Sequence, residues 1–258
     1  MNRLVRIGMV AKITVLEALR RKDLYVLLIL SLVFIGGTGA VRFFETAGFE
    51  RFLKEVSLKV IHICLTVIVV TATARQLPRE FEARTIYPLL AKPLSRLEFL
   101  VGKFVGCFLM GAFTLLLFNV EFFVATQIFG ANLGWVFLQG VYLSLLFVAL
   151  VVAMTLCFSF FLTQGANITV SLLVCFGAGL FSRSITLIHA EMGWLGQKAI
   201  LGLYHVFPHV DLFDLTAKIV HGYPPIAFKF LLILTIYAVI YVVLLLGIAQ
   251  LRFRRRPL

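Results

Sequence analysis

The chain has 258 residues, of which 61% are hydrophobic and 14% are charged, and its mean hydropathy is +1.03. Soluble domains carry about 25% charged residues, so this composition excludes an ordinary soluble domain and predicts one all-α polytopic membrane domain over residues 1–258. A net charge of +12 would suit a nucleic-acid partner, but the basic residues gather at the ends of apolar runs, which argues against one.

Residues 1–22 predict an N-terminal amphipathic surface helix. At about 100° per residue, Arg3, Arg6 and Glu17 share one side of the helix, while Leu4 and Val15 share the other. This pattern is typical of a helix that lies on a membrane surface with its basic side in water. An ordinary basic flank before the first span is the alternative.

Six apolar runs approach or exceed the roughly 20 residues that a span requires. The glycine-rich end of the first run is similar to a signal-peptide cleavage region, but its basic leader is unusually long, so we expect a retained span. A mixed-charge connection over residues 42–59 separates the first two spans, and its spacing permits a short surface helix. The predicted spans are residues 24–41, 58–77, 97–129, 135–162, 166–189 and 226–251.

Residues 75–103 are the longest segment that cannot lie in hydrocarbon, and apolar runs flank it on both sides. Three prolines break it, which predicts a short helix over residues 78–87, a turn, and a new helix from Ser95. Ser95 and Glu98 have the spacing of a capping box. A short charged helix between two spans is suited to docking against a soluble partner.

The connection over residues 191–225 contains an apolar piece, residues 192–207, that is broken by glycines and a lysine. It is too short and too interrupted to span comfortably, so we expect a re-entrant or interfacial hairpin. Metal binding is the weaker alternative for the polar cluster in this connection, because Pro208 disrupts a shared helical face. The cluster consists of His205, His209, Asp211, Asp214 and His221.

The lysines and arginines predict the orientation of the spans. Sixteen of the 24 lie at the N-terminus, within residues 75–103, or at the C-terminus. The richer side is expected to be cytoplasmic, so both termini lie inside and the number of spans is even. Six spans satisfy this condition. The excess of lysine and arginine residues is expected to contact anionic lipid head groups.

No catalytic or metal motif is present in the sequence. It contains no phosphate-binding loop, no H-E-x-x-H zinc helix and no G-x-S-x-G elbow. A function driven by ATP hydrolysis would therefore require an ATPase on another chain. The four cysteines all fall inside apolar runs without close spacing, and we expect them to be small core residues. They are Cys64, Cys107, Cys157 and Cys175.

Glu121 is the one carboxylate inside a long apolar run, with Asn119 nearby. An ionisable group in a span is a functional candidate by default. At about 1.5 Å per residue from Ser95, Glu121 reaches the outer edge of the hydrocarbon. Arg183 reaches a similar level, so an outer ion pair is one interpretation and a substrate pathway the other.

Residues 79–96 read REFEARTIYPLLAKPLSR, and Gly102-Lys103 follows them. This stretch resembles the coupling-helix region of ABC type 2 transporter permeases. In that family an acidic helix ends in Thr and is followed by a Leu-Leu pair, Pro, Ser-Arg, and Gly-Lys at the third span. The present chain has Arg84 where many members have Gly. The branch it resembles most contains permeases for gliding motility and for nitrous oxide reductase maturation.

The resemblance implies a permease subunit, an exporter in a bacterial or archaeal cytoplasmic membrane. Two such subunits, identical or paralogous, would stand above two separate ATPase subunits that bind ATP and Mg²⁺. The chain itself would carry no catalytic residue, cofactor or metal, and residues 191–225 would form an outer gate. Residues 78–94 would form the coupling segment, with the ATPase contacts made by Arg79, Glu80, Phe81, Glu82, Arg84, Thr85, Ile86 and Tyr87.

Two other classes of function are less well supported. An ion-driven secondary transporter predicts polar groups near the midplane, and Glu121 lies too far outward. An intramembrane enzyme or haem protein would need paired histidines inside the bundle, whereas these histidines sit at span ends or outside. The substrate is not predicted.

Overall fold

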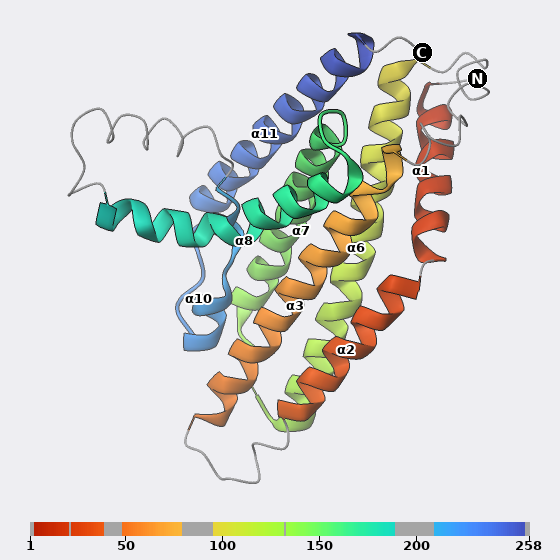
Figure 1. Ribbon diagram of the computed structural model, residues 1–258. Coiled ribbons are helices and arrows are strands. Elements are labelled where there is room, and N and C mark those ends of the chain that lie inside the picture. Colours follow the sequence, from red (N-terminus) through yellow and green to blue (C-terminus); the bar gives the residue numbers. More distant parts are fainter. Residues whose placement is uncertain are drawn as a thin grey trace.

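The computed structural model describes residues 3–20, 22–38, 48–78, 95–131, 133–188 and 209–255, and of residues 23, 24 and 178–188 it describes the backbone alone. All regular structure in these ranges is helical, without a strand, as the sequence predicts (Figure 1). The elements in order are α1 (Arg3–Leu19), α2 (Lys22–Thr38), α3 (Phe49–Ala74), α6 (Arg96–Phe129), α7 (Trp135–Phe158), α8 (Gln164–Ile188), η2 (Val210–Phe213), α10 (Thr216–His221) and α11 (Phe228–Arg255).

Four helices are long and apolar enough to cross a membrane: α3 extended to Pro78, α6, α7 and α11. The chain is a multi-pass membrane protein. Within the described ranges, the other two predicted spans correspond to shorter apolar helices, Tyr25–Thr38 in α2 and Gln164–Gly177 in α8. In Figure 1, α8 runs crosswise to its neighbours rather than along them. The count of six spans therefore stays a prediction.

α3 begins at Phe49, nine residues before the predicted start of the second span at residue 58, so the helix is longer than the predicted span. The bounds of the span itself stay a prediction. Part of the predicted connection is helical, since Lys54 and Glu50 form an i,i+4 ion pair at 2.6 Å on α3. Gly48 precedes the helix with φ of 98°, a left-handed conformation that glycine adopts without strain.

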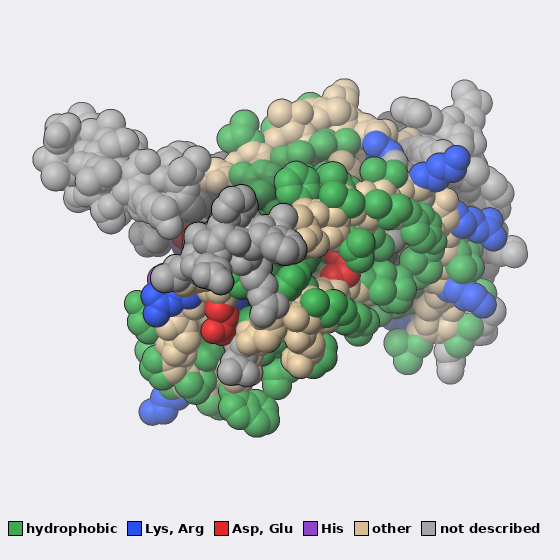
Figure 2. Space-filling model, turned by 90° about the horizontal axis from the view of Figure 1, so that it is seen from below, with side chains coloured by type: hydrophobic (Ala, Val, Ile, Leu, Met, Phe, Trp, Pro, Cys, Tyr) green, Lys and Arg blue, Asp and Glu red, His purple; other side chains and the backbone are tan. Residues whose placement is uncertain are grey.

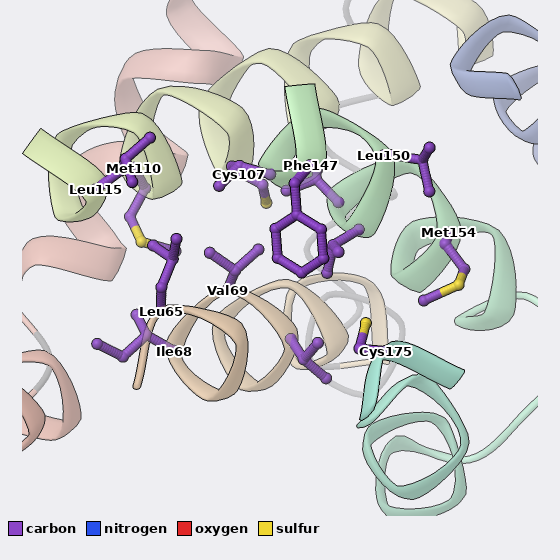
Figure 3. Packing of buried hydrophobic residues seen from close by; sticks show 14 of the residues in the cluster. Leu65, Ile68, Val69, Cys107, Met110, Leu115, Phe147, Leu150, Met154 and Cys175 are labelled. Carbon is purple, nitrogen blue, oxygen red and sulfur yellow. The ribbon is translucent and has the colours of Figure 1, made fainter. Parts of the chain in front are cut away.

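The core lies where α3, α6 and α7 meet. Apolar side chains from these helices point toward one another in Figure 3, among them Leu65 and Val69 of α3, Met110 of α6 and Phe147 of α7. These four side chains are each 2% exposed or less. The prediction for the cysteines is confirmed, because all four are buried and unpaired.

The outer surface is strongly apolar, and hydrophobic side chains dominate the view in Figure 2. On α11, side chains such as Ile233 and Val243 remain more than half exposed. A helix of this composition is stable in lipid, where exposed apolar side chains cost nothing. α11 thus forms part of the surface that faces the membrane or another subunit.

α1 packs lengthwise on α6, and the two helices run parallel. A helix lying flat on the membrane surface, as the sequence predicts, is not confirmed by this arrangement. Contacting pairs advance by one helical turn on each helix: Arg6 with Glu98, Val10 with Gly102, and Thr14 with Gly106. α1 nevertheless keeps an exposed apolar side that includes Leu4 and Ile13, 81% and 59% exposed.

Candidate functional site

The predicted coupling segment lies between two described helix ends. α3 continues to Pro78, and the chain is described again from Ser95, immediately before α6. Arg79, Glu80, Phe81, Glu82, Arg84, Thr85, Ile86 and Tyr87 all lie outside the described residues. The site is therefore described by the groups that hold its two ends.

The capping box predicted at Ser95 is present. The Ser95 hydroxyl accepts a hydrogen bond from the Glu98 backbone N–H at 3.2 Å, and the Glu98 carboxylate accepts one from the Ser95 N–H at 3.0 Å. Both bonds satisfy backbone donors that the first helical turn leaves without partners. The chain consequently enters α6 with a defined direction as it leaves the coupling segment.

Glu98 also links the start of α6 to α1. Its Oε1 accepts a hydrogen bond from Arg6 Nη2 at 2.9 Å, and Arg3 Nε lies 3.9 Å away. The side chains of Arg6 and Glu98 are only 18% and 6% exposed, so this charge-assisted contact is shielded from water. One carboxylate therefore caps α6 and anchors α1 at the same time.

Two glycines allow α1 to approach α6 closely. A Cβ at Gly102 would lie 2.7 Å from Val10 Cβ, and one at Gly106 would lie 2.6 Å from Thr14 Cβ. These separations are shorter than real Cβ contacts permit, so only glycine fits at either position. The G-x-x-x-G spacing is the one that lets membrane helices pack backbone to backbone. Sequence reasoning missed this contact, although the spacing was visible.

Arg96 and Lys103 tie two further helices to the start of α6. The Arg96 guanidinium donates to the carbonyls of Phe253 and Arg254 at 2.6 and 2.9 Å, and so caps the last turn of α11. Lys103, only 1% exposed, donates to Gln76 Oε1 at 2.9 Å near the end of α3. Both helix ends that flank the coupling segment are thereby fixed.

These groups form one connected set, which we call the anchoring cluster. It brings α1, α3, α6 and α11 together at one end of the molecule, where Figure 1 also marks both chain termini. A displacement of the segment between α3 and α6 would act on all four helices. The anchoring cluster comprises Arg6, Gln76, Ser95, Arg96, Glu98 and Lys103.

Glu121 has a partner that the sequence analysis did not anticipate. The Ser31 hydroxyl of α2 donates a hydrogen bond to Glu121 Oε2 at 2.7 Å. Ser31 is fully buried and Glu121 is half-buried, so the contact joins α2 to α6 within the apolar part of the bundle. The Arg183 side chain lies outside the described residues, and its pairing with Glu121 stays a prediction.

Asn119 faces a different side of α6, because two residues correspond to about 200° around a helix. Its Nδ2 donates to the Leu115 carbonyl at 2.7 Å. Asn119 also lines a cavity of about 40 Å³ between α3, α6, α7 and α10, together with His62 and Asp214. A cavity of this size and polarity holds a few water molecules. Asn119 and Glu121 thus have different neighbours, and a part for either in a substrate pathway stays a prediction.

Asp214 fixes α10 over this cavity. Its Oδ2 accepts a hydrogen bond from Lys59 Nζ at 2.9 Å, and its Oδ1 accepts one from the Thr216 N–H at 2.9 Å. Burial raises the pKa of Asp214, but the hydrogen bonds from Thr216 and Lys59 outweigh it and lower the pKa to about 2. Asp214 is thus ionised at neutral pH.

The outer polar cluster does not assemble into a metal centre in the part of the chain that the structure describes. No group of three or more His, Cys, Asp or Glu side chains gathers there, and His205 lies outside the described ranges. His62 of α3, which is not part of this cluster, packs against the Phe147 ring with ring centroids 4.8 Å apart. Of the described members of the polar cluster, Asp214 joins the start of α10 to Lys59 of α3, and the His209 N–H donates to the Tyr237 hydroxyl of α11.

The model of one protein family, described as ABC-2 family transporter protein, matches residues 9–258. The match covers nearly the whole chain, including the predicted coupling segment, α3, α6, α11 and the part of α1 from residue 9 onward. No curated protein matches the chain.

Proposed function

The chain belongs to the ABC-2 family of transporter proteins, and we propose that it is the permease subunit of an ATP-binding-cassette exporter driven by separate ATPase subunits. Membrane proteins of this family work with ATPase subunits, and they are transmembrane components that generally do not catalyse a reaction themselves. ATP and Mg²⁺ would bind to the partner. Residues 79–87 would dock on that partner.

The anchoring cluster is the observation that carries this proposal. A docking segment transmits force only if its ends are rigidly attached to the helices that must move. Here Lys103 and Gln76 join the end of α3 to α6, Glu98 holds α1, and Arg96 holds α11. Closure of an ATPase beneath the segment would therefore move four helices together.

The finer features of the proposal are supported by the distribution of charge and by the resemblance of residues 79–103. The Lys- and Arg-rich ends would face the cytoplasm of a bacterium or archaeon. Two copies, identical or paralogous, would form the pathway with six spans each. Residues 191–225 would contribute an outer gate, and the branch would be that of gliding-motility and nitrous oxide reductase maturation permeases.

Co-purification with an ATPase tests the proposal. The tagged chain is expressed with ATP-binding-cassette ATPases of the same genome, starting with any encoded by a neighbouring open reading frame. We expect one ATPase to co-purify and its hydrolysis to change when the permease is present. Glu82→Gln and Arg84→Gln should weaken the complex, whereas Glu55→Gln, an exposed carboxylate on α3, should not.

The opposite result is equally clear. If Glu82→Gln and Arg84→Gln leave both the complex and coupled hydrolysis intact, residues 79–87 do not form the docking surface. If the chain alone moves cargo when an ion gradient is applied, it is a secondary transporter.

A further inference from the structure

A shallow apolar groove runs along the seam between α2 and α3, at the end of α3 that lies away from the anchoring cluster. Its volume is about 290 Å³. Among the described lining residues, the one hydroxyl is that of Thr38, and it already donates to the Ile35 carbonyl. The lining residues are Val33, Phe34, Gly37, Thr38, Phe52 and Val56.

Gly37 creates the space in the groove. A Cβ built at Gly37 would meet no atom within 4 Å, and the same is true of the adjacent Gly36, which does not line the groove. The Phe34 and Phe52 side chains stand on either side, 54% and 43% exposed. A side chain at position 37 would therefore fill the groove without disturbing the helices.

The groove lies where an apolar surface meets a charged one. Ile29 and Val33 of α2 are 64% and 60% exposed. Apolar side chains exposed to this extent are stable in contact with lipid. The first turns of α3 are charged, and Glu50 is paired there with Lys54. Arg51, next to Phe52, is exposed and has no carboxylate partner among the described residues.

We propose that this groove is a binding site for a phospholipid, with an acyl chain along the α2–α3 seam and the phosphate held by Arg51. Apolar contact alone selects little inside a membrane, because lipid tails are as apolar as the helix surface. Selection needs a polar contact at the end of the groove. A guanidinium supplies one, since its planar donors match the oxygens of a phosphate group.

Photolabelling of the full-length chain tests the proposal without any partner protein. The chain is placed in nanodiscs of phosphatidylethanolamine and phosphatidylglycerol. These contain a phosphatidylethanolamine that carries a diazirine near the end of one acyl chain, and labelled peptides are identified by mass spectrometry. We expect labelling to concentrate on residues 33–38 and 52–56.

Two adjacent glycines provide the variant and its matched control. Gly37→Leu fills the groove and should remove this labelling, whereas Gly36→Leu adds the same side chain beside the groove and should leave it unchanged. Arg51→Gln removes the phosphate contact and should lower labelling about tenfold. Because both leucines enter open space on the same helix, thermal unfolding of the two variants should match.

Three results would overturn the proposal. Labelling spread evenly over the exposed helices, α11 included, would indicate only the general lipid layer. Equal labelling of the Gly36→Leu and Gly37→Leu variants would show that the groove holds no lipid chain. A change from dimer to monomer caused by Gly37→Leu alone would assign the groove to a second copy of the protein.

Discussion

Substitution of Gly106 by alanine tests the close contact between α1 and α6. A methyl group at this position would lie 2.6 Å from Thr14 Cβ and 2.9 Å from the Ala11 carbonyl oxygen. Neither atom can rotate away, because one is a Cβ and the other belongs to the backbone. The two helices must therefore separate, and overpacking of this kind costs about 1–3 kcal/mol.

The control is Gly247→Ala on α11, where a new Cβ would meet nothing within 4 Å. Both substitutions gain about 1 kcal/mol of helix propensity, so their difference isolates the steric cost. We expect hydrogen exchange of the α1 backbone amides to be about 5- to 150-fold faster in Gly106→Ala than in Gly247→Ala. Equal exchange rates in the two variants would refute the packing of α1 on α6.

Three further predictions concern individual polar contacts. Arg96→Gln removes the cap of α11 and should speed amide exchange in its last turn by about tenfold or more, while Arg96→Lys restores part of the protection. Asp214, whose pKa is lowered to about 2 by the hydrogen bonds from Thr216 and Lys59, contributes about 1–2 kcal/mol of stability that is complete above about pH 5 and lost as the pH falls through about 2. The difference in the free energy of unfolding between Asp214→Asn and the unaltered chain should therefore be smaller at about pH 2.5 than at about pH 6, and an equal difference at both pH values would contradict this. Glu121→Gln keeps an oxygen that accepts from Ser31, so thermal stability should hold; transport lost without unfolding would assign the carboxylate to a pathway.

The sequence was most informative where local chemistry determines structure. The apolar runs predicted an all-helical membrane protein, and the Ser95–Glu98 spacing predicted the capping box that is observed. Helix boundaries were less accurate. The charges at the start of α3 suggested a connection with room for a short surface helix, whereas one continuous helix runs from Phe49 into the apolar run, with Glu50 and Lys54 paired across one turn. Charge alone does not end a helix when the charged groups have partners.

Contacts between distant parts of the chain could not be predicted. Arg6 and Glu98 are 92 positions apart, and Ser31 and Glu121 are 90 apart. Periodicity shows which side of a helix is apolar, but it does not show which helix covers that side. The contact of Glu121 with the Ser31 hydroxyl of α2 was not anticipated for this reason, and the ion pair with Arg183 stays a prediction.

The central claim is that residues 79–87 dock on a separate ATPase, and cysteine cross-linking tests it most directly. A single cysteine replaces Thr85 in a chain whose four native cysteines are serine, and a thiol-reactive cross-linker is applied to inner-membrane vesicles that contain the ATPase. We predict a cross-linked permease–ATPase pair whose yield changes when ATP is added. Labelling of the same cysteine by an impermeant reagent from outside intact cells, with no cross-link to an ATPase, would contradict the account.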